Sequence, residues 1–168
     1  MKQIFLTSFL LSLALFGFSE QPRKAVGIRG GISSGFEYRV FSGELTSYKA
    51  LISFRNQGMQ FTGMKEFHVP DAFDFLHELS FIYGFGAHVG FESWYTREYH
   101  IENGLQYSIR DHRTGPVLGL DGLVATEYAI PAIPLMVGIE VKPYFNLFGE
   151  NFFKLQPFDF AFTVKYTF

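Results

Sequence analysis

Apolar and polar side chains alternate with a period of two along most of this sequence, from Ala25 to the last residue. The C-terminal segment shows the pattern most clearly. Every second residue from Phe158 to Phe168 is aromatic or β-branched, and polar or small residues stand between them. A period of two is typical of β-strands whose two faces meet different surroundings. The sequence therefore predicts an all-β protein.

Eight segments carry this alternation, and connections rich in turn-forming or polar residues separate them. The predicted strands cover residues 26–32, 36–40, 48–55, 59–67, 79–91, 118–128, 135–142 and 158–168. The predicted connections cover residues 33–35, 42–47, 56–58, 68–77, 92–115, 131–134 and 146–157. The alternation keeps its phase through residues 33–35, so residues 25–41 fit either one long strand or a hairpin of two.

Alternation of this kind fits two opposite kinds of barrel. A secreted soluble barrel points its apolar face inward, whereas an outer-membrane barrel points it at lipid and keeps its polar face in the lumen. The interior of an eight-stranded barrel is only just wide enough for its own side chains, and this aromatic face would overfill it. The polar face is rich in glycine and other small residues, which suit a crowded lumen. The sequence therefore favours an antiparallel, up-and-down transmembrane β-barrel of eight strands.

Charged residues on the polar face occur in equal numbers of each sign. Six are basic and six are acidic, and His88 stands among glycines on the same face. Burying a charge without a partner is prohibitively costly, so a closed lumen requires a balanced set. Lys65 is the exception on the apolar face, near a strand end from which it can snorkel. We expect a lumen charge network of Arg29, Glu37, Arg39, Lys49, Arg55, Glu66, His88, Asp121, Glu127, Glu140, Lys142, Asp159 and Lys165.

The amino-acid composition excludes several classes of function. The chain has 168 residues, 48% of them hydrophobic, with a formal net charge of −2 and no cysteine. This balance argues against a nucleic-acid-binding surface, and the missing cysteine excludes disulfides, zinc knuckles and thiol chemistry. At this length we expect a single domain.

Residues 1–19 have the three-part form of a secretory signal peptide. Lys2 precedes an apolar run over residues 4–18, and Gly17 and Ser19 are the small residues before the expected cleavage site. The run is shorter than the ~20 residues that a membrane-spanning helix needs. We expect residues 1–19 to be removed and residues 20–168 to form the barrel domain.

The polar residues give no catalytic or metal-binding constellation. His100 and Glu102 have the spacing that places two side chains on one face of a strand, but no third ligand follows at a recognisable spacing. We expect His88 to be a hydrogen-bonded lumen residue rather than a general base. The sequence therefore predicts neither a cofactor nor an enzymatic activity.

The connection over residues 92–115 is the longest, and it mixes charged with aromatic residues. Long loops on rigid frameworks tend to carry function, so a binding surface is expected there first. Trp94, Tyr95, Tyr99 and Tyr107 fit either an aromatic belt at the membrane interface or a binding surface.

Three glycine-rich segments carry a resemblance: Val26-Gly-Ile-Arg-Gly-Gly31, Tyr83-Gly-Phe-Gly86 and Leu118-Gly-Leu-Asp-Gly122. Behind a signal peptide, they resemble the small OmpA/OmpX-type outer-membrane β-barrels of Gram-negative bacteria, and within these a largely uncharacterised branch. The resemblance implies a barrel embedded in outer-membrane lipid with both termini in the periplasm. It places residues 92–115 and 146–157 outside the cell, 131–134 in a short periplasmic turn, and 68–77 in an unusually long one.

The last residues carry a second resemblance. Val164, Tyr166 and Phe168, ending on an aromatic carboxyl terminus, resemble the signal that the barrel-assembly machinery reads. The resemblance makes that machinery an expected partner of the C-terminal strand.

Three functions remain open on the sequence alone. The favoured one is a non-enzymatic integral outer-membrane barrel with a closed, salt-bridged lumen, acting in envelope integrity, surface interaction or limited permeation. The second is a secreted, lipocalin-like barrel that binds a small apolar ligand, although no Gly-x-Trp motif opens the first strand. The third is a barrel enzyme that modifies lipid A.

Overall fold

The structure is a computed structural model of the chain. It describes residues 24–55, 58–70, 72–73, 76, 78–102, 105–149 and 153–168, and for residues 96–111 it describes the backbone alone. The predicted signal peptide over residues 1–19 lies outside the described residues. Within the described part of the chain, no helix is long and apolar enough to cross a membrane.

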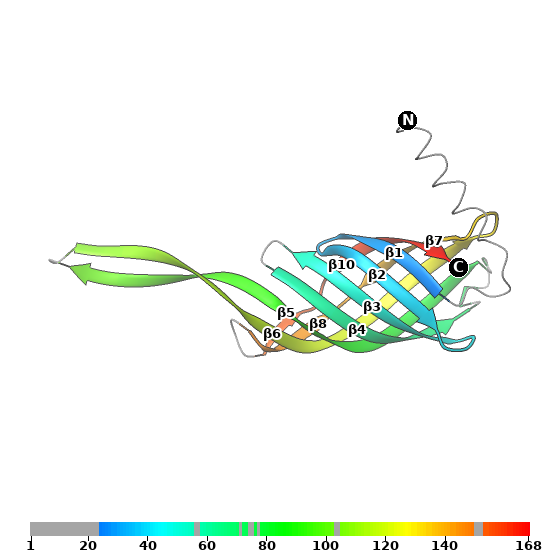
Figure 1. The fold of residues 1–168 in the computed structure, drawn as a ribbon, viewed down its shortest axis with the longest axis horizontal. Helices are drawn as coiled ribbons and strands as arrows, with labels where there is room; N and C mark the ends of the chain where they lie inside the picture. Colours follow the sequence, from blue (N-terminus) through cyan, green and yellow to red (C-terminus); the bar gives the residue numbers. More distant parts are fainter. Residues whose placement is uncertain are drawn as a thin grey trace, which may run out of the picture.

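The described residues form ten β-strands in one antiparallel sheet (Figure 1). The strands are β1 (Lys24–Gly31), β2 (Ser34–Phe41), β3 (Thr46–Arg55), β4 (Gly58–Val69), β5 (Leu79–Glu102), β6 (Leu105–Ile130), β7 (Leu135–Val141), β8 (Tyr144–Phe148), β9 (Lys154–Gln156) and β10 (Phe160–Thr167). The region over residues 25–41 is thus a hairpin, because β1 ends at Gly31 and β2 begins at Ser34.

The sheet closes on itself as an eight-stranded barrel. Strands β1 to β6 pair in chain order, and β1 pairs with β10. β7 and β8 pair with successive parts of β6, while β10 pairs with β7 and β9 pairs with β8. These four short strands are therefore the halves of two interrupted ones. The closed antiparallel barrel of eight strands that the alternation predicts is confirmed.

Proline explains the interruption between β7 and β8. Pro143 has no N–H to donate to a β-ladder. The strand that begins at Leu135 is therefore interrupted beside Pro143 and continues as β8. The Pro143 carbonyl still accepts a hydrogen bond from Gly122 at 2.8 Å, and this contact holds the break against β6. The loop predicted over residues 146–157 is wrong at both ends, because β8 runs to Phe148 and β9 begins at Lys154.

The connection predicted over residues 92–115 is also wrong, since this stretch is the outer part of β5 and β6. Their pairing runs from Leu79 opposite Tyr128 to Glu102 opposite Leu105. β4 accompanies β5 only as far as Glu92, and β8 accompanies β6 only as far as Leu118. Residues 93–102 and 105–114, called the ribbon below, therefore stand out beyond the barrel (Figure 1). At about 3.3 Å per residue the ribbon is roughly 33 Å long.

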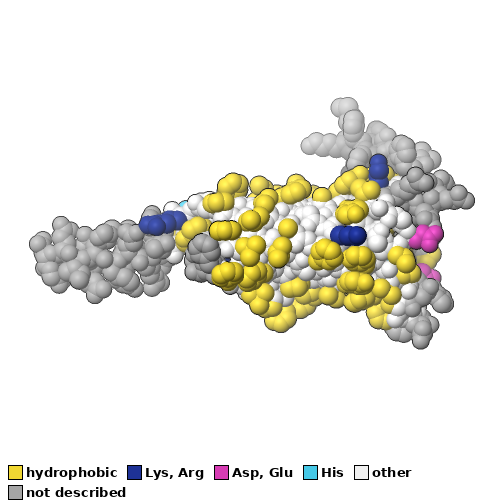
Figure 2. Space-filling view, turned by 90° about the horizontal axis from the view of Figure 1, so that it is seen from below, with side chains coloured by type: hydrophobic (Ala, Val, Ile, Leu, Met, Phe, Trp, Pro, Cys, Tyr) yellow, Lys and Arg dark blue, Asp and Glu magenta, His cyan; other side chains and the backbone are white. Residues whose placement is uncertain are grey.

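The wall of the barrel separates an apolar outer surface from a charged interior. Phe162, Phe36 and Phe85 are 69%, 65% and 62% exposed on the outside. Figure 2 shows hydrophobic side chains over the barrel wall, with Asp and Glu side chains in this view only at its end. By contrast, Lys49 and Lys142 are 1% and 0% exposed. The two faces of each strand thus meet opposite surroundings.

Candidate functional site

A chain of ion pairs runs along the lumen, beginning at the end of the barrel that bears the ribbon. Arg55 Nη2 lies 3.1 Å from Asp159 Oδ2. Asp159 also pairs with Arg29, whose Nη2 lies 3.3 Å from Oδ1, and accepts a hydrogen bond from the Ser33 hydroxyl at 2.8 Å. Arg29 in turn pairs with Glu140. Residues from β1, β3 and β7 and the residue before β10 therefore meet inside the barrel.

Lys49 continues the chain at mid-height. Its Nζ lies 2.9 Å from Glu140 Oε2, 3.1 Å from Glu66 Oε1 and 3.4 Å from Glu37 Oε2. One ammonium group from β3 thus joins carboxylates from β2, β4 and β7.

Arg39 and Lys165 end the chain near the termini, where they share Glu127. Arg39 Nη1 lies 2.6 Å from Glu127 Oε2, and its Nε lies 2.6 Å from Glu66 Oε2. Lys165 Nζ lies 2.5 Å from Glu127 Oε1 and 2.8 Å from Glu37 Oε1. The whole chain joins five basic and five acidic side chains, so its formal charges cancel.

A second cluster surrounds Asp121. The carboxylate accepts hydrogen bonds from Lys142 Nζ and His88 Nδ1, both at 2.7 Å. His88 Nε2 lies 3.0 Å from Asn146 Oδ1. Gly119 makes room for the imidazole, because a Cβ at this position would lie 2.5 Å from a ring carbon. Both ring nitrogens of His88 thus face polar side chains inside the lumen.

All thirteen residues predicted for the lumen network point into the barrel. Twelve are at most 5% exposed, and the Arg55 side chain is 17% exposed at the end of the lumen.

The lumen also contains a small apolar cluster that the sequence pattern did not predict. It is formed by Met64, Ile82, Leu123 and Ala125. These four residues stand at positions of the polar, inward face in the alternation, so their place inside the barrel could have been predicted from the sequence.

The structure describes the residues of the predicted assembly signal, but not the side chains of His100 and Glu102. Val164 and Phe168 point outward and are 42% and 43% exposed, and the Tyr166 ring stacks on Phe168 with centroids 6.2 Å apart. The side chains of His100 and Glu102 lie outside the described part of the chain. Within that part, no three His, Asp or Glu side chains stand close enough to hold a metal ion.

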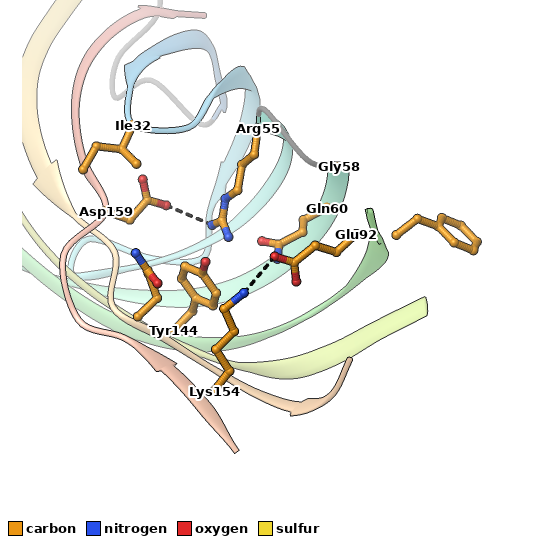
Figure 3. A pocket seen from close by; sticks show the side chains of 10 residues that line it. Ile32, Arg55, Gly58, Gln60, Glu92, Tyr144, Lys154 and Asp159 are labelled. Atoms are coloured by element: carbon orange, nitrogen blue, oxygen red, sulfur yellow. Dashed lines mark hydrogen bonds and ion pairs between the residues drawn. The ribbon is translucent and has the colours of Figure 1, made fainter. Parts of the chain in front are cut away.

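A pocket of about 300 Å³ opens at the ribbon end of the lumen (Figure 3). We call it the mouth pocket. It is lined by Ile32, Arg55, Gly58, Gln60, Phe91, Glu92, Tyr144, Lys154, Gln156 and Asp159. These residues come from the strand ends and turns at one end of the barrel, opposite the termini.

Two ion pairs lie on opposite sides of the mouth pocket (Figure 3). One is Arg55 with Asp159, and the other joins Lys154 Nζ to Glu92 Oε1 at 3.1 Å. The Arg55 guanidinium lies 4.0 Å from the centre of the Tyr144 ring, as in a cation–π contact. The sequence pattern does not connect Glu92, Tyr144 and Lys154 with the lumen, since Glu92 and Lys154 lie in predicted loops.

Comparison with known proteins shows a similarity of fold. No family model and no curated protein matches the sequence. Among solved structures, the chain is similar to the N-terminal β-barrel domain of OprF from Pseudomonas aeruginosa, with a TM-score of 0.52. The two are 9% identical, and the match covers 86% of this chain and 95% of that one. The similarity supports the OmpA-like barrel fold that the sequence resemblance implies.

Proposed function

We propose that this protein is an integral outer-membrane barrel, non-enzymatic and closed, that anchors the ribbon at the cell surface. The observation that carries the proposal is the inverted distribution of side chains, with charges buried inside and large apolar groups exposed outside. Monomeric soluble proteins rarely expose apolar patches of this extent. In lipid the same surface is favourable, because a closed barrel pairs its backbone groups internally.

The filled lumen supports an anchor rather than a wide channel. Ion pairs occupy the interior from Arg55 at the mouth to Lys165 near the termini. Wide aqueous channels belong to barrels of sixteen or more strands. The same ion pairs occupy the space in which a lipocalin-like barrel would hold an apolar ligand, so they also argue against that alternative.

The non-enzymatic part of the proposal rests on the surroundings of His88. Its two ring nitrogens face Asp121 and Asn146 at 2.7 and 3.0 Å. A hydrolase or acyltransferase needs its base beside a nucleophile, and these partners supply none. A lipid A profile that is unchanged by deletion of the gene is the expected result, and a mass shift of lipid A would contradict it.

The two ends of the barrel give the proposed orientation. β1 begins and β10 ends at one end, and the ribbon leaves from the other (Figure 1). With the termini in the periplasm, as the resemblance implies, the ribbon and the mouth pocket face the outside of the cell. The predicted signal peptide over residues 1–19 would direct the export that this location requires.

The test is gel migration of the protein extracted from fractionated membranes, with boiled and unboiled samples side by side. We expect the protein in the outer-membrane fraction and a shift on boiling, because a closed barrel in lipid resists detergent until it is heated. Urea-unfolded protein that has not been refolded is the control, and it should show no shift. A soluble protein without a shift would contradict the proposal and favour the lipocalin-like alternative.

A further inference from the structure

The mouth pocket contains a polar group that has no hydrogen-bond partner in the described part of the chain. Gln60, near the start of β4, is 4% exposed, and its Oε1 accepts no hydrogen bond from the described residues. Gln60 lines the pocket together with Arg55, Glu92 and Lys154 (Figure 3). A buried acceptor without a donor is unfavourable, so a solute that donates a hydrogen bond here would remove this cost.

Arg55 offers the complementary group. Its Nη2 donates to Asp159 at 3.1 Å, but its buried Nε has no acceptor among the residues that the structure describes. The pocket thus has one unmatched acceptor and one unmatched donor. A hydroxyl group both donates and accepts hydrogen bonds, so hydroxyls of one solute can match both.

The charges of the pocket favour a neutral solute. Arg55 is paired with Asp159, and Lys154 is paired with Glu92, so the four formal charges cancel. A charged solute would have to break one of these pairs, whereas a neutral one leaves both intact. The volume of about 300 Å³ equals that of roughly ten water molecules, which suits a single sugar ring.

We infer that the mouth pocket binds a neutral, hydroxyl-bearing solute of the size of one sugar residue. The solute reaches Gln60 past the rim pair of Lys154 and Glu92, whose side chains are 30% and 16% exposed. This part-buried pair is more exposed than the pair of Arg55 with Asp159, so it gives way more easily to an entering solute. The inference goes beyond the anchoring role, and its test uses the protein refolded in detergent, so it does not depend on the membrane location.

The test is a calorimetric titration of the refolded protein with glucose, galactose, mannose and N-acetylglucosamine, and with lysine and glutamate as charged probes. We expect binding of at least one sugar and neither amino acid. Gln60→Leu removes the unmatched acceptor at similar volume, and it should weaken sugar binding at least about fivefold.

Thr62→Val is the matched control. Thr62 lies two residues further along β4, is 0% exposed and has an unpartnered Oγ1, but it does not line the pocket. Replacing an unpartnered buried polar group by an apolar one of similar shape is neutral or stabilising, so both variants should fold and shift on boiling. Thr62→Val should bind sugar like the unaltered protein. Absence of sugar binding, binding of an amino acid instead, or equal binding by both variants would overturn the inference.

Discussion

Glu140 shows how single residues hold this barrel together. It lies on β7, is 1% exposed, and pairs with Arg29 from β1 and with Lys49 from β3. The side chain therefore ties together strands that are not neighbours in the sheet. Because each partner is also buried, removing one carboxylate leaves positive charge inside the lumen without compensation.

We expect Glu140→Ala to destabilise the folded barrel by about 3–5 kcal/mol, the usual cost of breaking a buried pair from one side. Denaturant unfolding in phospholipid vesicles measures the change. Lys65→Leu is the control, because Lys65 stands on the outer face, where replacing a lysine by an apolar residue is neutral or stabilising. Equal effects of the two variants would mean that the lumen network does not stabilise the barrel.

At the scale of elements, the ribbon is the part that the barrel does not need. Its residues pair with each other and have no further strand beside them. An isolated two-stranded hairpin is marginally stable in water, so it adds little to the stability of the wall. Its length beyond the barrel suits it for contact with partners outside the membrane.

We expect a variant with residues 93–114 replaced by an Asn-Gly turn to fold and to shift on boiling. Its free energy of unfolding should stay within about 1 kcal/mol of the unaltered value, because the barrel pairings up to Glu92 and Gly115 remain. If the variant does not fold, the ribbon is part of the barrel's stability and not an appendage.

The C-terminal strand gives the second prediction at this scale. Phe168 exchanges backbone hydrogen bonds with Lys24 at 2.9 and 3.1 Å, where the barrel closes. We expect Phe168→Ala to lower the amount of barrel assembled in cells while leaving the stability of the refolded protein within about 1 kcal/mol. Phe158→Ala is the control, since Phe158 is also an outward-facing phenylalanine, 61% exposed, and lies outside the predicted assembly signal. Equal assembly of both variants would count against that signal.

The sequence predicted the strands of the barrel wall and failed beyond it, for one physical reason. Between lipid and lumen the two faces of a strand differ, so residues such as Phe160 and Ala161 alternate. Past Glu92 the ribbon leaves the barrel and has no neighbouring strand, so the contrast between lipid and lumen that marks a strand is lost. The break at Pro143 depends on its register against Gly122, which the alternation does not contain.

The candidate site, like the fold, could be predicted only in part from the sequence. The phase of the alternation is enough to place Lys49 or Glu140 on the inner face. It does not reveal that Gln60 shares a pocket with Tyr144 and Lys154, because their proximity arises from barrel closure and from strand ends predicted as loops. Individual ion pairs, such as that of Arg29 with Glu140, likewise require the stagger of the strands.

At the scale of the whole molecule, the proposed membrane location depends on the outward direction of the apolar face. The most direct measurement uses the absence of native cysteine to place one label at a time, in vesicles whose acyl chains are brominated. A fluorophore on Phe162→Cys, at a side chain 69% exposed on the wall, should be quenched by the lipid. One on Glu44→Cys, in the exposed turn between β2 and β3, should be quenched by aqueous iodide instead. Quenching of the Phe162→Cys label by iodide and not by lipid would contradict the lipid-facing barrel.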